Sequence, residues 1–487
     1  MLKRTILLSL SCCMFIGCGT KISDASGGSA GPAVISPDYK EVTIPSNIAP
    51  LNYRYAMNDI RSARTTFRID GKTAILRGTE VKWKLKKWKS FVSGAAGRTM
   101  EVKATVKANG KVIEDAWSIY ISEDNVDPYL TYRLIEPAYQ MWNEGSIEER
   151  CVENFKETTI CDYRQTDNSC MNCHVHGQQR GDLSLFYIRG TKGGAILNRD
   201  GELRKLTLKT DDMISGTVYG ELHPSGRFGV FSTNIIISGL HTHAGDRMEV
   251  YDTSSDLTVA DFDNNIMINV PEAARQDALE TFPCFSADGN SVFYCIADTV
   301  VLPERVHDLR YSLVKAPFDI SCGVIGPDVD TLWNGNIHDA SVCHPKASPD
   351  GRWLMFTVSS YGTFPLYHTD CTLNLMDLRT GEVHVLDDIK GDKSDTYHSW
   401  SSDGHWFVFA SKRWNGQFGK PYYCHIDDNG NVSKPFVLPQ KSPDFYDYFL
   451  KSFNVPDIGR ESVGITSRDS RKMFNAMSEP FSSSGQH

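Results

Sequence analysis

The chain has 487 residues and a formal net charge of −9 at pH 7, with a sequence pI of about 5.9. This length allows two or three domains with full cores, and the acidic balance disfavours nucleic acid as a partner. Beyond the N-terminal segment, no stretch is long and apolar enough to cross a bilayer as a helix.

The first 18 residues predict export. Lys3 and Arg4 form a short positive region, and the apolar stretch from Thr5 to Gly17 is too short for a membrane span. Phe15-Ile16-Gly17-Cys18 resembles a bacterial lipobox, which implies that Cys18 is lipidated and becomes the mature N-terminus. An ordinary secretory signal with a chance cysteine is the alternative. We expect a lipid-anchored protein of the cell envelope, in the periplasm or at the outer membrane, touching the membrane through this lipid only.

Residues 19–37 are predicted to be a flexible tether, because Gly, Ser and Ala dominate them. Residues 38–125 then show a β pattern. The segments 81–85 and 100–106 alternate apolar and polar residues, and Asn109-Gly110 is a strong hairpin signal between the second of these and a strand near Trp117. A small β-sandwich of this length fits the pattern.

Residues 126–182 are predicted to be a short helical linker. Asp127-Pro128 is a helix start, and apolar residues follow at helical spacing. Pro137 interrupts the pattern, so a kink or a break is expected there.

Within this linker, Cys170-Met171-Asn172-Cys173-His174 is typical of a c-type haem attachment site. Two thiols three residues apart can form thioethers with the two vinyl groups of one haem, and His174 can take an axial position on the iron. A zinc site would require two more ligands at short spacing, and only His176 lies close. A thioredoxin-like pair would require a βαβ context that the flanking sequence lacks.

Thirteen cysteines are present, and eight of them lie outside both the signal and the haem motif. Their even number permits disulfides in an exported protein, but spacing does not determine the pairing. Cys151 and Cys161 flank a short loop and are the first candidates for a disulfide; buried free thiols are the alternative.

Residues 183–455 contain a repeat. A turn followed by an alternating apolar strand recurs four times, with turn glycines at Gly226, Gly289, Gly351 and Gly404. A four-stranded unit at this period of 53 to 63 residues is typical of a propeller blade. Residues 183–208 form a degenerate fifth unit around Asp200-Gly201, and a sixth could be built from the chain ends. We therefore expect an all-β protein: a small N-terminal β-sandwich plus a five- or six-bladed β-propeller.

The repeat turns, such as Ser348-Pro349-Asp350-Gly351, resemble the WD40-like repeats of TolB-type propellers, which are six-bladed. A second resemblance spans nearly the whole chain. The order of signal, Pro45-Ser46-Asn47, haem motif, Gly193-Gly194, propeller and Tyr397-His398-Ser399-Trp400 is similar to that of exported bacterial lipoproteins often labelled cytochrome c-related. This resemblance implies haem and a domain order, and it names no substrate.

Seven of the 14 histidines fall on one predicted face of the propeller, where the loops between second and third strands and the crossings between blades lie. The haem motif can reach the same face. His398 is the first candidate for a second axial ligand and His241 the second, whereas a five-coordinate or Met-ligated iron is the alternative. His241, His243 and Asp246 could instead hold a divalent metal.

These features predict an envelope-anchored monohaem cytochrome-like lipoprotein, with covalent haem c, that transfers electrons or docks a redox partner or envelope protein on the propeller face. The alternative is a non-catalytic propeller that binds or scaffolds, with haem as a structural staple between the two domains. No phosphate loop or dinucleotide fingerprint appears, so enzymatic activity stays open. Residues 456–487 are predicted to be a tail that becomes polar from Ser467 and frays.

Overall fold

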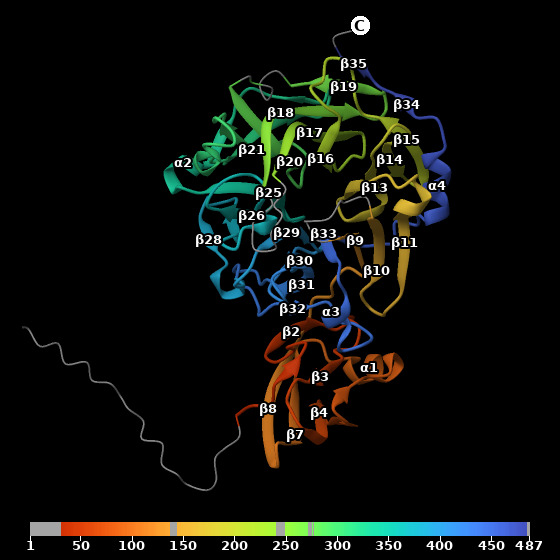
Figure 1. Ribbon diagram of the computed structural model, residues 1–487, viewed down its shortest axis with the longest axis vertical. Helices are drawn as coiled ribbons and strands as arrows, with labels where there is room; N and C mark the ends of the chain where they lie inside the picture. The colour runs from red at the N-terminus through yellow and green to blue at the C-terminus, as the bar shows by residue number, and fades with distance from the viewer. Residues whose placement is uncertain (1–30, 137–143, 240–248, 271–274, 276, 485–487) are drawn as a thin grey trace, which may run out of the picture.

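The computed structural model describes residues 31–136, 144–239, 249–270, 275 and 277–484. These residues form two bodies, a small β-sandwich and a large β-propeller, which stand one below the other in Figure 1. Cys18 and most of the predicted tether lie outside the described residues, as does His241. None of the described helices is long and apolar enough to span a membrane.

The N-terminal body is a sandwich of a five-stranded and a three-stranded sheet, as the sequence predicted. The larger sheet has the order β2-β8-β7-β4-β5, and the smaller has the order β1-β3-β6. Their bounds are β1 Ile35–Ser36, β2 Val42–Pro45, β3 Tyr53–Tyr55, β4 Ile60–Ile69, β5 Lys72–Arg77, β6 Glu80–Val81, β7 Arg98–Ala108 and β8 Lys111–Ser122.

Two details of this body differ from the prediction. The predicted strand over 81–85 is wrong, because the helix α1 (Leu85–Val92) begins at its last residue and buries Trp88, Phe91 and Val92 on one face. The ordered domain also begins before residue 38, since Ala33 and Ile35 are buried in the sandwich core. The hairpin at Asn109-Gly110 is confirmed, and both residues have positive φ, of 52° and 70°.

The propeller has six blades, each with its first strand nearest the axis. Four blades are separate sheets, and the ten-stranded sheet contains two more that are joined by a single parallel pair between β18 and β20. Blade 1 contains β33 (Ser452–Gly459), β9 (Tyr129–Ile135), β10 (Ser146–Cys151) and β11 (Glu157–Asp162). Blade 2 contains β12 (Met171–Gly177), β13 (Arg180–Ile188), β14 (Gly194–Arg199) and β15 (Glu202–Thr207).

The other four blades follow in chain order. Blade 3 contains β16 (Thr217–Leu222), β17 (Phe228–Gly239), β18 (Glu249–Asp261) and β19 (Ile266–Asn269). Blade 4 contains β20 (Ala278–Phe285), β21 (Ser291–Asp298), β22 (Ser312–Asp319), β23 (Val324–Ile325) and β24 (Asp330–Trp333). Blade 5 contains β25 (Ser341–Ala347), β26 (Trp353–Ser359), β27 (Thr372–Asp377) and β28 (Val383–Val385). Blade 6 contains β29 (Asp395–Trp400), β30 (Trp406–Ser411), β31 (Lys420–His425) and β32 (Phe436–Val437).

The predicted helical linker over 126–182 is wrong. Residues 129–135 form β9, which pairs with β10 on one side and with β33 from the far end of the chain on the other. This pairing closes the ring of blades with strands from both ends of the propeller, and it supplies the sixth blade. In the described part of the segment the only helix is the one-turn 3₁₀ helix η1 (Tyr163–Gln165). The four predicted turn glycines are confirmed, with φ between 72° and 75°.

The C-terminal segment is ordered up to residue 484. α4 (Ser467–Phe474) begins with a capping box between Thr466 and Asp469 and packs beside blades 1 and 2. β34 (Glu479–Pro480) and β35 (Ser482–Ser483) then add to the outer strands of blades 2 and 3. The expectation of a frayed tail is therefore wrong, because backbone pairing and the cap fix it. The remaining short helices are α2 (Gly335–His338), α3 (Phe445–Tyr448), η3 (Val306–Asp308), η4 (Pro365–Tyr367) and η5 (Asp387–Ile389).

The sandwich and the propeller share one continuous core. Buried residues of the sandwich, such as Trp88, belong to the same cluster as Trp400 and Trp406 of blade 6. Direct bonds reinforce the junction: the Asn52 amide donates to the carbonyls of Gln440 and Lys441 at 3.1 and 3.2 Å. None of these contacts involves the segment Cys170–His174.

Candidate functional site

The predicted haem motif lies on the innermost strand of blade 2, at the propeller axis. Cys170 immediately precedes β12, and Cys173 and His174 lie within it. Cys170 and Cys173 are both partly exposed, whereas only 7% of His174 is exposed. The motif is thus not on a linker between the two bodies, where the sequence placed it.

All six innermost strands break their pairing at the same place. In each strand the register shifts, and one residue at the shift has a positive φ, between 48° and 55°. Such a bulge leaves the extra residue unpaired with the neighbouring strand. We call these six residues the axial ring: Cys173, Tyr219, Phe282, His344, Tyr397 and Val455.

Four of the six ring residues are aromatic and in contact. The ring centroids of Tyr219 and Phe282 are 4.5 Å apart, those of Phe282 and His344 are 4.4 Å apart, and those of His344 and Tyr397 are 4.4 Å apart. Val455 and Cys173 complete the circle with smaller side chains. The axis is therefore packed with aromatic groups on one side, and the Cys173 thiol lies on the other.

Sequence reasoning missed this ring, although a signal for it exists. In blades 4 and 5 the ring residue is followed by Pro283 and Pro345, each six positions before the turn glycine of its blade. Proline within a sheet is found at bulges and edges, because it has no N–H to donate to the ladder. In blades 3 and 6, Gly220 and His398 occupy the same position, also six before the turn glycine.

The thiol of Cys173 and the imidazole of His174 are both held in their neutral forms. Burial raises the pKa of Cys173, and the weaker opposing effects come from the backbone N–H of Tyr219 and from Arg189 and Arg133. Burial lowers the pKa of His174 to about 4. A neutral imidazole is the form that binds a metal ion.

The hydrogen bonding of His174 leaves one nitrogen free. Its Nε2 atom is buried and has no hydrogen-bond partner among the described residues. The backbone of Val455 opposes the lowering of the His174 pKa only weakly. In the neutral tautomer with the proton on Nδ1, the Nε2 lone pair is available to a metal ion.

These residues fit the donor set of a haem c. Two partly exposed thiols lie three residues apart, and the adjacent imidazole has an unpartnered Nε2. The structure does not support the alternative of a zinc site, because no group of three or more His, Cys, Asp or Glu suited to a metal ion occurs among the described residues. The His241, His243 and Asp246 alternative lies outside the described residues.

The structure gives His398, the first candidate for the second axial ligand, a different partner. His398 follows the ring residue of blade 6 just as His174 follows that of blade 2. Its Nε2 lies 2.9 Å from the carbonyl of Met355 in blade 5, so Nε2 carries the proton. His174 and His398 thus occupy equivalent positions, but Nε2 is bonded in His398 and has no partner in His174, and no described contact joins the two residues.

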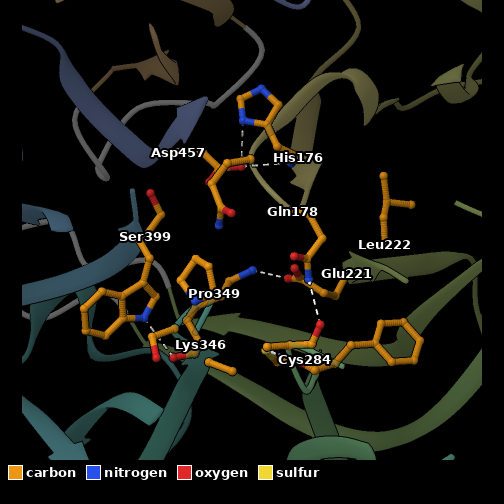
Figure 2. A pocket seen from close by; sticks show the side chains of 15 residues that line it. His176, Gln178, Glu221, Leu222, Cys284, Lys346, Pro349, Ser399 and Asp457 are labelled. Atoms are coloured by element: carbon orange, nitrogen blue, oxygen red, sulfur yellow. Dashed lines mark hydrogen bonds and ion pairs between the residues drawn. The ribbon is translucent and has the colours of Figure 1, made fainter. Parts of the chain in front are cut away.

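A small polar cavity lies on the axis beyond the ring (Figure 2). It measures about 40 Å³, and Glu221 forms an ion pair with Lys346 at its wall. On the opposite wall Asp457 accepts from the backbone N–H of His176 at 2.9 Å and lies 3.4 Å from its ring. This volume suits about three water molecules and not a haem.

The predicted disulfide is not present, since Cys151 and Cys161 are both free. Burial raises the pKa of Cys161 to about 12, so its thiol is inert. Among the described cysteines, Cys322 is exposed, and Cys151, Cys170 and Cys173 are partly exposed.

No family model and no curated protein matches the chain. Among solved structures, TolB from Acinetobacter baumannii is similar, with a TM-score of 0.42 and 12% identity, over 77% of this chain and 85% of that one. The tricorn protease has a TM-score of 0.36 and 11% identity, over 82% of this chain and 36% of its own. A quinonprotein alcohol dehydrogenase-like protein from Bacteroides thetaiotaomicron has a TM-score of 0.29 and 7% identity, over 83% and 95%.

Proposed function

We propose that this chain is an exported, lipid-anchored β-propeller protein that carries one covalent haem c. Cys170 and Cys173 would form the two thioethers, and His174 would bind the iron through Nε2. The haem supplies one-electron redox chemistry, and the chain supplies the attachment, the axial ligand and the surroundings. Electron transfer to an envelope partner is the function that this arrangement supports best.

The unpartnered Nε2 of His174, next to the two cysteines, carries the proposal. A buried imidazole nitrogen without a partner is unfavourable. Four other histidines, His176, His344, His368 and His398, also have such a nitrogen, but only His174 directly follows a pair of cysteines three residues apart. The two partly exposed thiols beside it are the remaining requirement for covalent attachment.

The test is to produce the full chain with and without a haem-attachment system. We expect the first product to contain haem that resists acid-acetone extraction. Cys170→Ala and Cys173→Ala should each abolish double attachment, and Cys322→Ala, which removes an exposed thiol elsewhere, should leave it intact. His174→Ala should keep attached haem but change its absorption spectrum. A mature protein that carries no haem in the presence of the attachment system would sink the proposal.

The alternative, haem as a staple between the sandwich and the propeller, loses its main support. The motif lies in blade 2, and the two bodies are joined by their shared core and by bonds such as Asn52 to Gln440. A binding module without redox activity is still distinguishable by experiment. Reversible reduction of the haem in the folded protein favours electron transfer, whereas a haem that is reduced only on unfolding favours the non-catalytic module.

A further inference from the structure

The N-terminal sandwich is basic, whereas the rest of the chain is acidic. Residues 38–125 contain 16 Lys and Arg against 10 Asp and Glu, and the other residues contain 35 against 50. Two bodies of opposite net charge in one protein are attracted to different surroundings. Part of the positive charge of the sandwich gathers on the outer face of its five-stranded sheet.

Five exposed cations lie on this outer face. The strands β4, β7 and β8 lie side by side in the lower body of Figure 1. Along β4, outward side chains alternate with buried ones such as Ala63 and Phe67, and β7 shows the same alternation. The register of the sheet places Arg64 of β4 directly opposite Arg77 of β5. The five exposed cations of this face are Arg64, Arg68, Arg77, Lys103 and Lys107.

These cations lack counter-charges within the protein. Among the described residues, none of the five forms an ion pair or a side-chain hydrogen bond. Like charges directly opposite each other on neighbouring strands, as Arg64 and Arg77 are, destabilise a sheet. Glu101 and Glu114 lie on the same face, and Glu41 lies at its edge, where it accepts from the backbone of β8. The face therefore keeps an excess of positive charge, which an anionic surface would neutralise.

Large apolar side chains are exposed on the same face. Ile75 of β5 is 42% exposed, and Val112 and Tyr120 of β8 are 57% and 41% exposed. The register places Val112 directly opposite Lys107, and Ile75 lies two positions before Arg77 on the same strand. Basic side chains interspersed with exposed aliphatic and tyrosine side chains suit the headgroup region of a membrane, where apolar stems are buried and charged ends stay in water.

The N-terminal segment enters the sandwich beside this sheet. The N–H of Ala33 donates to the Asp115 carboxylate of β8 at 3.0 Å. Twelve residues separate Gly31 from Cys18, the residue predicted to be lipidated. A tether of this length and of the predicted Gly- and Ser-rich composition spans about 20 Å. A lipid on Cys18 would therefore keep the sheet near a membrane surface.

We propose that the outer face of the five-stranded sheet docks on an anionic phospholipid surface. Its five cations lie at the headgroups, with Ile75, Val112 and Tyr120 between them. The tether argument rests on the export and lipidation of the proposed function, whereas the charge and the exposed apolar side chains are independent of haem and of lipid. The same surface repels the acidic propeller, so docking through the sandwich holds the propeller away from the membrane.

The test uses the chain from residue 19, which lacks the lipidated cysteine and keeps every described residue. We expect it to float with vesicles of phosphatidylethanolamine and phosphatidylglycerol, and not with vesicles of phosphatidylcholine alone. Arg64→Gln combined with Lys103→Gln should weaken binding about 25-fold, because each cation at such a surface contributes about fivefold. Salt at about 1 M should remove most of the binding, because it shortens the screening length to about 3 Å.

Lys86→Gln combined with Lys87→Gln is the matched control, because it removes the same charge from exposed positions of α1. This helix lies on the inner side of the sheet, where the Trp83 ring contacts both Phe67 of β4 and Trp88 of α1. Thermal unfolding checks that both double variants fold.

Equal weakening by the two double variants would show that only net charge matters, and it would overturn the inference. A chain that fails to float with the anionic vesicles at low salt would also overturn it, and an acidic protein would then be the better candidate for this face. Neither outcome depends on whether haem or lipid is attached, so a failure here is distinguishable from a failure of the proposed function.

Discussion

The two sides of the axial ring carry side chains of opposite charge, and these side chains differ in whether they can become neutral near pH 7. On the side of blades 3 and 4, Asp252 and Glu280 are almost completely buried, and burial raises their pKa values to about 6 and about 8. On the side of blades 1 and 6, Arg133 and Lys412 are cations without a described carboxylate partner. The acids can avoid an uncompensated charge by binding a proton near neutral pH. Lys412 can likewise lose its proton near neutral pH, because burial lowers its pKa to about 7, whereas Arg133 keeps its charge.

The largest effect is expected at Glu280. Both of its carboxylate oxygens are buried without a partner, and burial followed by the charge of Asp256 raises its pKa from 4.5 to about 8. Its contribution to stability is fully present below pH 4.5 and is lost as the pH rises to 8, at about 1.4 kcal/mol per pH unit.

Glu280→Gln removes the ionisable carboxyl group. The free energy of unfolding of the variant should therefore not decline between pH 4.5 and pH 8. We expect the variant to be more stable than the wild type by about 4 kcal/mol at pH 8 and by almost nothing at pH 4.5. Urea unfolding between pH 4.5 and pH 8.5 measures the difference. Parallel pH profiles for the two proteins would show that Glu280 ionises in the fold without penalty.

Below the ring the two kinds of charge meet in the ion pair between Lys346 and Glu221. Lys346→Met leaves Glu221 beside the axial cavity without its counter-charge. We expect a loss of about 2–3 kcal/mol in the free energy of unfolding, somewhat less than for a fully buried pair, because the cavity admits water. The double variant Lys346→Met with Glu221→Gln should recover most of the loss. If it recovers none, the cost arises from packing and not from the charge.

Lys412 tests the cationic side and should show the opposite dependence on pH. Burial lowers its pKa from 10.5 to about 7, so between these values the unfolded chain binds more protons and stability rises with pH. In Lys412→Met the free energy of unfolding should not rise with pH. After allowance for the lost contact with Tyr367, the variant should be more stable than the wild type by about 2 kcal/mol at pH 6.5. Urea unfolding of both proteins at pH 6.5 and pH 9.5 measures this difference. A wild type whose stability is flat over this range would mean that the ammonium is solvated.

The sequence revealed the blades because each one carries its own local signals, namely a turn glycine and an alternating strand. It did not reveal blade 1, because β9 is fixed by β33, which lies more than 300 residues away along the chain. Without that partner, Leu130 and Leu134 also fit helical spacing. The predicted haem motif rests on five adjacent residues, whereas Arg133 and Lys412 come from blades 1 and 6 and form no sequence pattern.

For the histidines, the sequence could predict the position in the fold but not the hydrogen-bond partner. Placing His398 near the axis was possible from the repeat, because it lies six residues before a turn glycine. Its hydrogen bond to Met355, 43 residues earlier, was not predictable, since it depends on how blades 5 and 6 pack. That bond decides which ring nitrogen carries the proton, and therefore whether His398 resembles His174 in chemistry as well as in position.

The smallest expected effect is at this position. His398→Leu leaves the Met355 carbonyl without its donor, so the free energy of unfolding should fall by about 1–2 kcal/mol. Because Nε2 of His398 is occupied by that bond, the absorption spectrum of the haem-loaded protein should stay the same, and no new carbon monoxide binding should appear. His174→Ala is the matched variant at the equivalent position of blade 2, and it should change the spectrum. A shift to high spin with carbon monoxide binding in His398→Leu would instead establish His398 as the second axial ligand, which would require blades 5 and 6 to release it when haem is attached.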